Sequence, residues 1–126
     1  MIKSNYINDI LELLLDSDEN GLFTRQQISF LTDINFDYTG SGLFVHFQHD
    51  IGIGKYRIKT QNLVLDGVKI KSERHQIEAQ ATLFFKEGLI DSLEIWCYDG
   101  EYPKRDLTSY TLTQTWLNSD NKIIIK

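Results

Sequence analysis

The sequence has one cysteine, one proline and no long hydrophobic run, and each shortage excludes a class of protein. A single cysteine, Cys97, cannot form an intramolecular disulfide, so we expect a cytoplasmic protein in a reducing compartment. The longest apolar run near the N-terminus covers residues 13–15 and lies in an acidic segment, unlike a signal peptide. Since no window approaches the length of a membrane-spanning helix, we expect no membrane association.

Positive charge is also scarce, because eighteen acidic residues face thirteen basic ones and the net charge is −5. This balance argues against a nucleic-acid binder, which presents cationic surface to phosphate. The charge is uneven: residues 51–80 hold six Lys or Arg against three acids, whereas residues 87–106 hold six acids against two. The acidic segment therefore fits a protein partner with a basic surface.

The motifs of common enzymes are missing. The chain has no Gly-x-Ser-x-Gly elbow, no His-Glu-x-x-His pair and no phosphate loop, so we expect neither catalysis nor a cofactor. His46, His49 and Asp50 are residue types that ligate zinc. His46 and His49, however, are three positions apart on an expected strand and would point to opposite faces. No metal site is predicted.

The opening stretch "SNYINDILELLLD" is typical of an amphipathic helix. Ser4 or Asn5 can cap its start. The apolar residues follow the i, i+3, i+4, i+7 spacing of one helix face: Ile7, Ile10, Leu11 and Leu14. This helix needs a hydrophobic surface to pack against.

Strand patterns begin at Phe30. Period-two alternation over residues 30–38 predicts a half-buried strand, "TGSG" at residues 39–42 predicts a turn, and residues 43–47 resume a strand. One face of the first strand is predicted to carry Phe30, Thr32, Ile34, Phe36 and Tyr38.

The middle of the chain contains two further turn signals. Residues 49–61 predict a loop followed by a short strand. In "LVLDGVKI", Asp66 and Gly67 separate two β-branched or apolar runs, which predicts a hairpin. Glu87 and Gly88 predict the turn of a longer hairpin over residues 76–98.

The end of the chain predicts two more strands. Residues 109–116 alternate again, and "KIIIK" at residues 122–126 is typical of an edge strand flanked by lysines. Residues 1–126 are therefore expected to form a single α+β domain. Its N-terminal helix would pack on a curved, mainly antiparallel sheet of about six to eight strands.

The segment "LEIWCYDGEYP", residues 93–103, suggests where a partner binds. If Leu93, Ile95 and Cys97 point into the core, alternation places the residues between them on the other side of the sheet. The predicted binding residues are Phe84, Glu94, Trp96, Tyr98, Asp99, Glu101, Tyr102 and Asp106. The alternative is that the sheet curls or is covered, so that the aromatic rings merely fill a core.

Two stretches resemble a group of small uncharacterised bacterial proteins. They are "YTGSGLFVHF" (residues 38–47) and "EAQATLFFKEGLIDSLEIWCYDGEYP" (residues 78–103), with a Tyr-Thr-Gly-x-Gly turn, a hairpin, and Leu-Glu before an aromatic, acidic loop that ends in proline. The resemblance covers about half the chain and brings no catalytic residues. Small acidic single domains of this type occur as immunity proteins beside bacterial toxins, an analogy of size and charge.

The sequence thus predicts a non-enzymatic bacterial protein-binding domain, specifically an immunity-type inhibitor of a basic toxin. Two alternatives stay open. One is a small-molecule-binding domain whose pocket lies between the curved sheet and the helix, lined by Phe84, Trp96 and Tyr98. The other is a homodimer whose aromatic face forms the seam.

Overall fold

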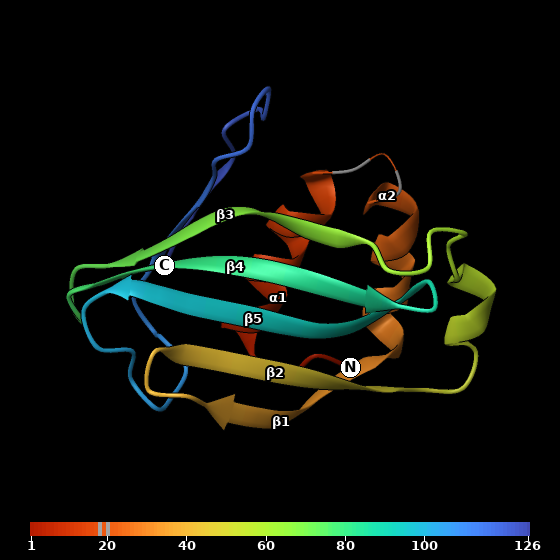
Figure 1. Cartoon of the computed structure of the whole chain (residues 1–126), viewed down its shortest axis with the longest axis horizontal. Coiled ribbons are helices and arrows are strands. Elements are labelled where there is room, and N and C mark those ends of the chain that lie inside the picture. Colours follow the sequence, from red (N-terminus) through yellow and green to blue (C-terminus); the bar gives the residue numbers. More distant parts are fainter. Residues whose placement is uncertain (18, 20) are drawn as a thin grey trace.

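A computed structural model describes residues 1–17, 19 and 21–126, with helices on one side of a seven-stranded sheet (Figure 1). The helical elements are α1 (Asn5–Leu14), η1 (Leu15–Ser17), α2 (Gly21–Thr24), η2 (Arg25–Phe30) and η3 (Ile53–Tyr56). The strands are β1 (Leu31–Tyr38), β2 (Gly42–His49), β3 (Val64–Ser72), β4 (Ile77–Lys86), β5 (Leu89–Asp99), β6 (Thr111–Gln114) and β7 (Ile123–Ile125).

The strands lie in the order β1-β2-β5-β4-β3-β6-β7, and all described pairings are antiparallel. In Figure 1, α1 lies behind the central strands, so the side of the sheet opposite α1, here called the outer face, is turned to the reader. This arrangement confirms the predicted α+β class and the N-terminal helix packed on an antiparallel sheet. The predicted edge strand is also correct, since β7 lies at one edge of the sheet.

The start of α1 is fixed by two polar side chains. The Ser4 hydroxyl caps the helix by accepting a hydrogen bond from the Ile7 N–H at 3.1 Å. The buried carboxylate of Asp33 in β1 accepts from the N–H groups of Lys3 at 2.8 Å and Ser4 at 3.1 Å. Together these bonds join the first turn of the helix to the sheet.

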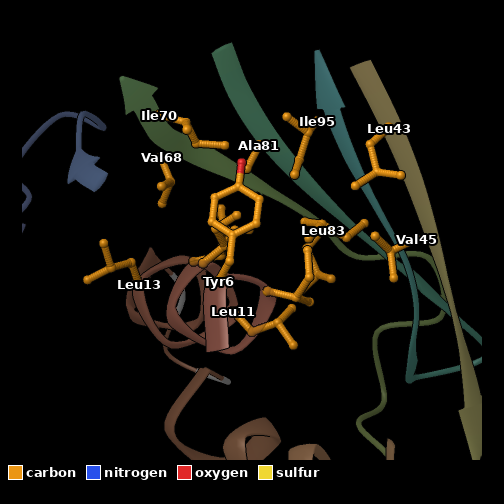
Figure 2. Close-up of a cluster of buried hydrophobic side chains, with 14 of the residues drawn as sticks. Tyr6, Leu11, Leu13, Leu43, Val45, Val68, Ile70, Ala81, Leu83 and Ile95 are labelled. Atoms are coloured by element: carbon orange, nitrogen blue, oxygen red, sulfur yellow. The ribbon is translucent and has the colours of Figure 1, made fainter. Parts of the chain in front are cut away.

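The core lies between α1 and the inner side of the sheet (Figure 2). Figure 2 shows Leu43, Val45 and Ile95 reaching from the strands toward the helix. The predicted apolar residues of the helix, Ile7, Ile10, Leu11 and Leu14, are all buried, and Tyr6 and Leu13 are buried with them. Burial of this stripe, at about 25 cal/mol per Å² of apolar surface, is the main force that holds the helix on the sheet.

The predicted hairpin at Asp66 and Gly67 is wrong, because β3 runs through these residues as one strand. Leu65 pairs with Leu83 of β4 before the irregularity, and Val68 pairs with Ala81 of the same strand after it. Gly67 has a φ of 95°, which fits a β-bulge as well as a turn. The Asp-Gly signal identified a special backbone position but not its tertiary context.

The prediction for β1 is correct as a strand and wrong in its faces. A bulge between Asp33 and Asn35 shifts the register against β2. Leu31 and Asp33 are therefore buried before the bulge, whereas Phe36 is half-buried after it. A single bulge reverses the alternation, so Phe30 through Tyr38 do not present one continuous face.

The predicted short strand within residues 49–61 is also absent from the structure. This segment contains turns and η3, and it joins the sheet through isolated hydrogen bonds. The Ile58 N–H donates to the Gly88 carbonyl at 3.1 Å, and the Gly88 N–H donates to the Gln61 carbonyl at 3.0 Å. The loop thus packs against the turn between β4 and β5 without forming a ladder.

Polar contacts connect the last two strands to the helical layer. The Gln114 amide of β6 donates to the Leu13 carbonyl at 3.0 Å and to Asp16 at 2.8 Å. Asp16 also pairs with Arg25, and with Lys122 at 2.9 Å. Burial alone would raise the pKa of Asp16, but the hydrogen bonds from Arg25, Lys122 and Gln114 outweigh it and lower that pKa.

Candidate docking face

The hairpin of β4 and β5 carries most of the predicted binding residues. Its turn consists of Glu87 and Gly88, as predicted, with φ angles of 54° and 79°. Positive φ at both positions matches the right-handed twist of a two-residue hairpin. The turn therefore fixes which residues of the two strands lie opposite each other.

Alternation along β5 places the aromatic side chains on the outer face. Leu93, Ile95 and Cys97 are buried, whereas Trp96 is 53% exposed and Tyr98 is 39% exposed. The predicted separation of the two sets is confirmed. The alternative, in which both rings are sealed in a core, does not hold for this chain.

Trp96 and Tyr98 form a contacting pair of rings. Their centroids are 5.9 Å apart and their planes are inclined by 43°. Directly opposite Trp96 on β2 lies Gly42, where an added Cβ would come within 1.9 Å of the Ile95 carbonyl oxygen. Since only glycine fits there, no cross-strand side chain covers the indole from β2.

Phe84 and Glu94 extend this surface along the hairpin, and both are half-buried on the outer face. Phe84 lies opposite the exposed Val64 of β3, and Glu94 lies opposite Phe44 of β2. We define the aromatic–acidic face as Phe84, Glu94, Trp96, Tyr98 and Asp99.

A lysine and a glutamate border the aromatic pair. The Lys69 ammonium lies 3.0 Å from a carboxylate oxygen of Glu78. The hydrogen bond with Glu78, followed by the interaction with Tyr98, raises the pKa of Lys69. Lys69 is therefore already paired within the chain.

A recess of about 410 Å³, lined in part by Asp99, opens at the end of the sheet. Its charged lining consists of Glu73, Glu78 and Asp99 against one lysine, Lys71. Glu78 and Asp99 are directly paired across β4 and β5, and like charges in that position repel each other. The Lys69 ammonium compensates the charge of Glu78, and a cation from a partner would compensate that of Asp99.

Of the three predicted residues beyond β5, Tyr102 and Asp106 do not share the outer face with the aromatic pair. Glu101 is exposed, but it lines a separate recess with Gly40 and His75. Tyr102 is buried, and its hydroxyl forms a 2.8 Å hydrogen bond with that of Tyr6 in α1. The prediction that Tyr102 extends the exposed patch is therefore wrong.

The position of Tyr102 follows from a backbone bend. Gly100 has a φ of 88°, and an added Cβ there would lie 2.2 Å from the Gln76 carbonyl oxygen. The chain turns at this glycine toward the helix side of the sheet. Asp106 follows the same course and lines a recess beside Tyr6 and Tyr110, away from Trp96.

Sequence reasoning missed two members of the outer face, Phe44 and Lys69. Phe44 lies opposite Glu94, and Lys69 interacts with Tyr98. Alternation in β2 could have identified Phe44 as an outward residue. Its place beside Glu94 depends on the β2–β5 pairing, which connects residues far apart in the sequence.

The histidine cluster does not form a metal site. His49 makes a 2.6 Å hydrogen bond to the Ile90 carbonyl through Nε2, whereas His46 is exposed on the outer face. Among the described residues, no group of three or more His, Cys, Asp or Glu side chains is arranged to hold a metal ion. Burial raises the pKa of the Cys97 thiol, which disfavours the reactive thiolate.

Within the described part of the chain, no helix has the length and apolar character needed to cross a membrane. The chain matches no protein family, no curated protein and no solved structure. Functional inference therefore depends on the geometry of the aromatic–acidic face.

Proposed function

We propose that this chain is a non-enzymatic protein-binding domain that docks a basic protein partner on its aromatic–acidic face. In the specific form that we propose, it is a bacterial immunity-type inhibitor that neutralises a basic toxin by covering its working surface. The proposal places the chain in the cytoplasm, where the thiol of Cys97 stays reduced.

The observation that carries the proposal is the exposed pair of Trp96 and Tyr98. Tryptophan and tyrosine are enriched among the residues that dominate binding energy, because their rigid rings supply large contact area at little entropic cost. Here both rings project from β5, an interior strand of a seven-stranded sheet. A partner that covers them would remove apolar surface from water on a scaffold that is already ordered.

The charges around the rings support a basic partner. Glu94 and Asp99 flank the aromatic pair, and the adjoining recess adds Glu73 and Glu78. Opposite charges across an interface speed association and favour the correct partner. Lys69, which interacts with Tyr98, is paired with Glu78 and so repels such a partner little.

The experiment begins with photo-crosslinking in the native host, with p-benzoylphenylalanine in place of Trp96. The matched control carries the same group in place of Leu117, which is 88% exposed outside the strands. We expect one basic protein to crosslink from position 96 and not from position 117. That protein is then purified for binding measurements.

Binding kinetics with the purified protein complete the test. We expect Trp96→Ala to weaken affinity by at least about tenfold, mainly through faster dissociation. Asp99→Lys should slow association at low salt, and the difference should shrink as salt is added. If both variants bind like the wild type, or if position 96 captures no protein, the proposal is wrong.

A further inference from the structure

The C-terminal strand β7 has one paired side and one free side. The Gln114 N–H donates to the Lys122 carbonyl at 3.1 Å, and the Lys126 N–H donates to the Tyr110 carbonyl at 2.9 Å. Because backbone groups alternate in direction along a strand, those of Ile124 also face β6. The N–H and C=O groups of Ile123 and Ile125 therefore point away from the sheet, where no described strand pairs with them.

The sequence of this strand is the same in both directions. Lys-Ile-Ile-Ile-Lys, residues 122–126, is a palindrome centred on Ile124. If two copies pair antiparallel about Ile124, Ile123 of each copy lies opposite Ile125 of the other. The free backbone groups then form hydrogen-bonded pairs, and the two Ile124 residues meet at the two-fold axis.

The exposed side chains fit this pairing. Ile123 is 55% exposed and Ile125 is 73% exposed, and both lie on the outer face opposite Thr113 and Thr111. Cross-strand pairs of β-branched residues stabilise a sheet. A second β7 would cover both isoleucines of each copy.

Lysines commonly protect an edge strand from such pairing, but here both lysines are already engaged. Lys122 lies 2.9 Å from Asp16, and Lys126 lies 3.8 Å from Asp9. Both acids belong to the helical layer, so the ammonium groups are directed to that side of the sheet and their charge is compensated. The edge is left with apolar side chains and unpaired backbone groups.

We propose that two copies of this chain associate through β7, joining their sheets edge to edge around a two-fold axis at Ile124. The occupant of this edge is a second copy because the palindrome makes the strand complementary to itself. The seam is separate from the aromatic–acidic face and leaves that face open in both copies. The inference therefore does not depend on the proposed function.

Disulfide trapping tests the seam directly. In a Cys97→Ala background, Ile124→Cys places the only thiol at the two-fold axis, where opposed residues of a non-hydrogen-bonded pair have Cα atoms about 4.5 Å apart. We expect a covalent dimer on mild oxidation. The control, Leu117→Cys in the same background, should stay predominantly monomeric under the same conditions.

Mass measurement by light scattering over a range of concentrations supplies a second test. The wild type should approach twice the mass of one chain at high concentration, and Trp96→Ala should behave like the wild type. Ile125→Pro removes an outward N–H that β6 does not use, so it should raise the dimer dissociation constant at least about tenfold without unfolding the chain. A wild type that stays monomeric, or a dimer that survives Ile125→Pro but not Trp96→Ala, would overturn the proposal.

Discussion

The hydroxyl oxygens of Tyr6 and Tyr102 lie 2.8 Å apart in the core, and their hydrogen bond joins α1 to the loop after β5. Tyr110 packs on the same cluster, with its ring centroid 4.9 Å from that of Tyr6, and its hydroxyl donates to Asp9 at 2.8 Å. The loop therefore connects the sheet to the helix, whereas the aromatic–acidic face ends at Asp99, before the bend at Gly100.

Removing either hydroxyl of this pair should destabilise the fold. Tyr102→Phe leaves the Tyr6 hydroxyl buried without its partner, which costs about 1–3 kcal/mol of unfolding free energy. In the double variant with Tyr6→Phe, neither hydroxyl is left unpaired, so the loss should be smaller than the sum of the single losses. Denaturant unfolding of the wild type, the two single variants and the double variant measures this coupling. Additive losses of unfolding free energy would contradict the hydrogen bond.

The same cluster predicts sensitivity to alkali. Burial, followed by the interaction with Tyr102, raises the pKa of Tyr6 well above 10, and burial likewise raises the pKa values of Tyr102 and Tyr110. Because the folded state holds these phenols neutral, their contribution to stability is complete below pH 10 and is lost as the pH rises toward the raised values.

Unfolding free energy measured from neutral pH upward checks this expectation. The loss of stability above pH 10 should be smaller in Tyr102→Phe than in the wild type, since one raised pKa is removed. Equal slopes in the two proteins would show that the phenol of Tyr102 does not contribute to the alkaline transition.

Neighbouring residues of β5 should differ sharply in their effect on stability. Ile95 is buried, so Ile95→Ala should cost about 2–5 kcal/mol. Trp96 is half-exposed on the opposite side, and Trp96→Ala should cost much less despite removing more atoms. Thermal or denaturant unfolding distinguishes the two, and a reversed order would contradict the assignment of faces.

Alternation made much of this surface predictable from the sequence. A two-residue signal predicts the turn at Glu87 and Gly88. The alternation within β5 alone predicts the outward positions of Trp96 and Tyr98. The place of Phe44 beside Glu94 required knowledge of which strands pair, and the burial of Tyr102 required knowledge of a bend at Gly100. Neither pairing over long range nor the direction of a loop is encoded in a short window.

The Asp66–Gly67 bulge shows a related limit. An Asp-Gly pair between apolar runs has the backbone freedom for either a hairpin or a bulge. In this chain, Thr115 of the segment after β6 donates from its N–H to the Gly67 carbonyl at 2.7 Å, and Trp116 packs against Gly67. These distant contacts, together with the shared partner strand β4, determine that the strand continues.

Gly67 and Gly40 have similar φ angles, so together they provide a controlled test of the packing of Trp116 against Gly67. At Gly67, with φ 95°, an added Cβ would lie 2.9 Å from Trp116, whereas at Gly40, with φ 85°, no atom lies within 4 Å. Gly40→Ala should cost about 1 kcal/mol from backbone strain alone. Gly67→Ala should cost more because Trp116 must also move, and equal losses of unfolding free energy would contradict this contact.

The proposed docking face is tested most directly by the solvent accessibility of the Trp96 indole. This accessibility is measured in the free chain and in its complex with the partner that crosslinking identifies. In a Trp116→Phe background, acrylamide should quench Trp96 fluorescence efficiently in the free chain, and the purified partner should protect it. A Trp96→Phe protein that retains Trp116 serves as the control and should show no such protection. An indole that is already shielded in the free chain, or that stays equally accessible in the complex, would contradict the account.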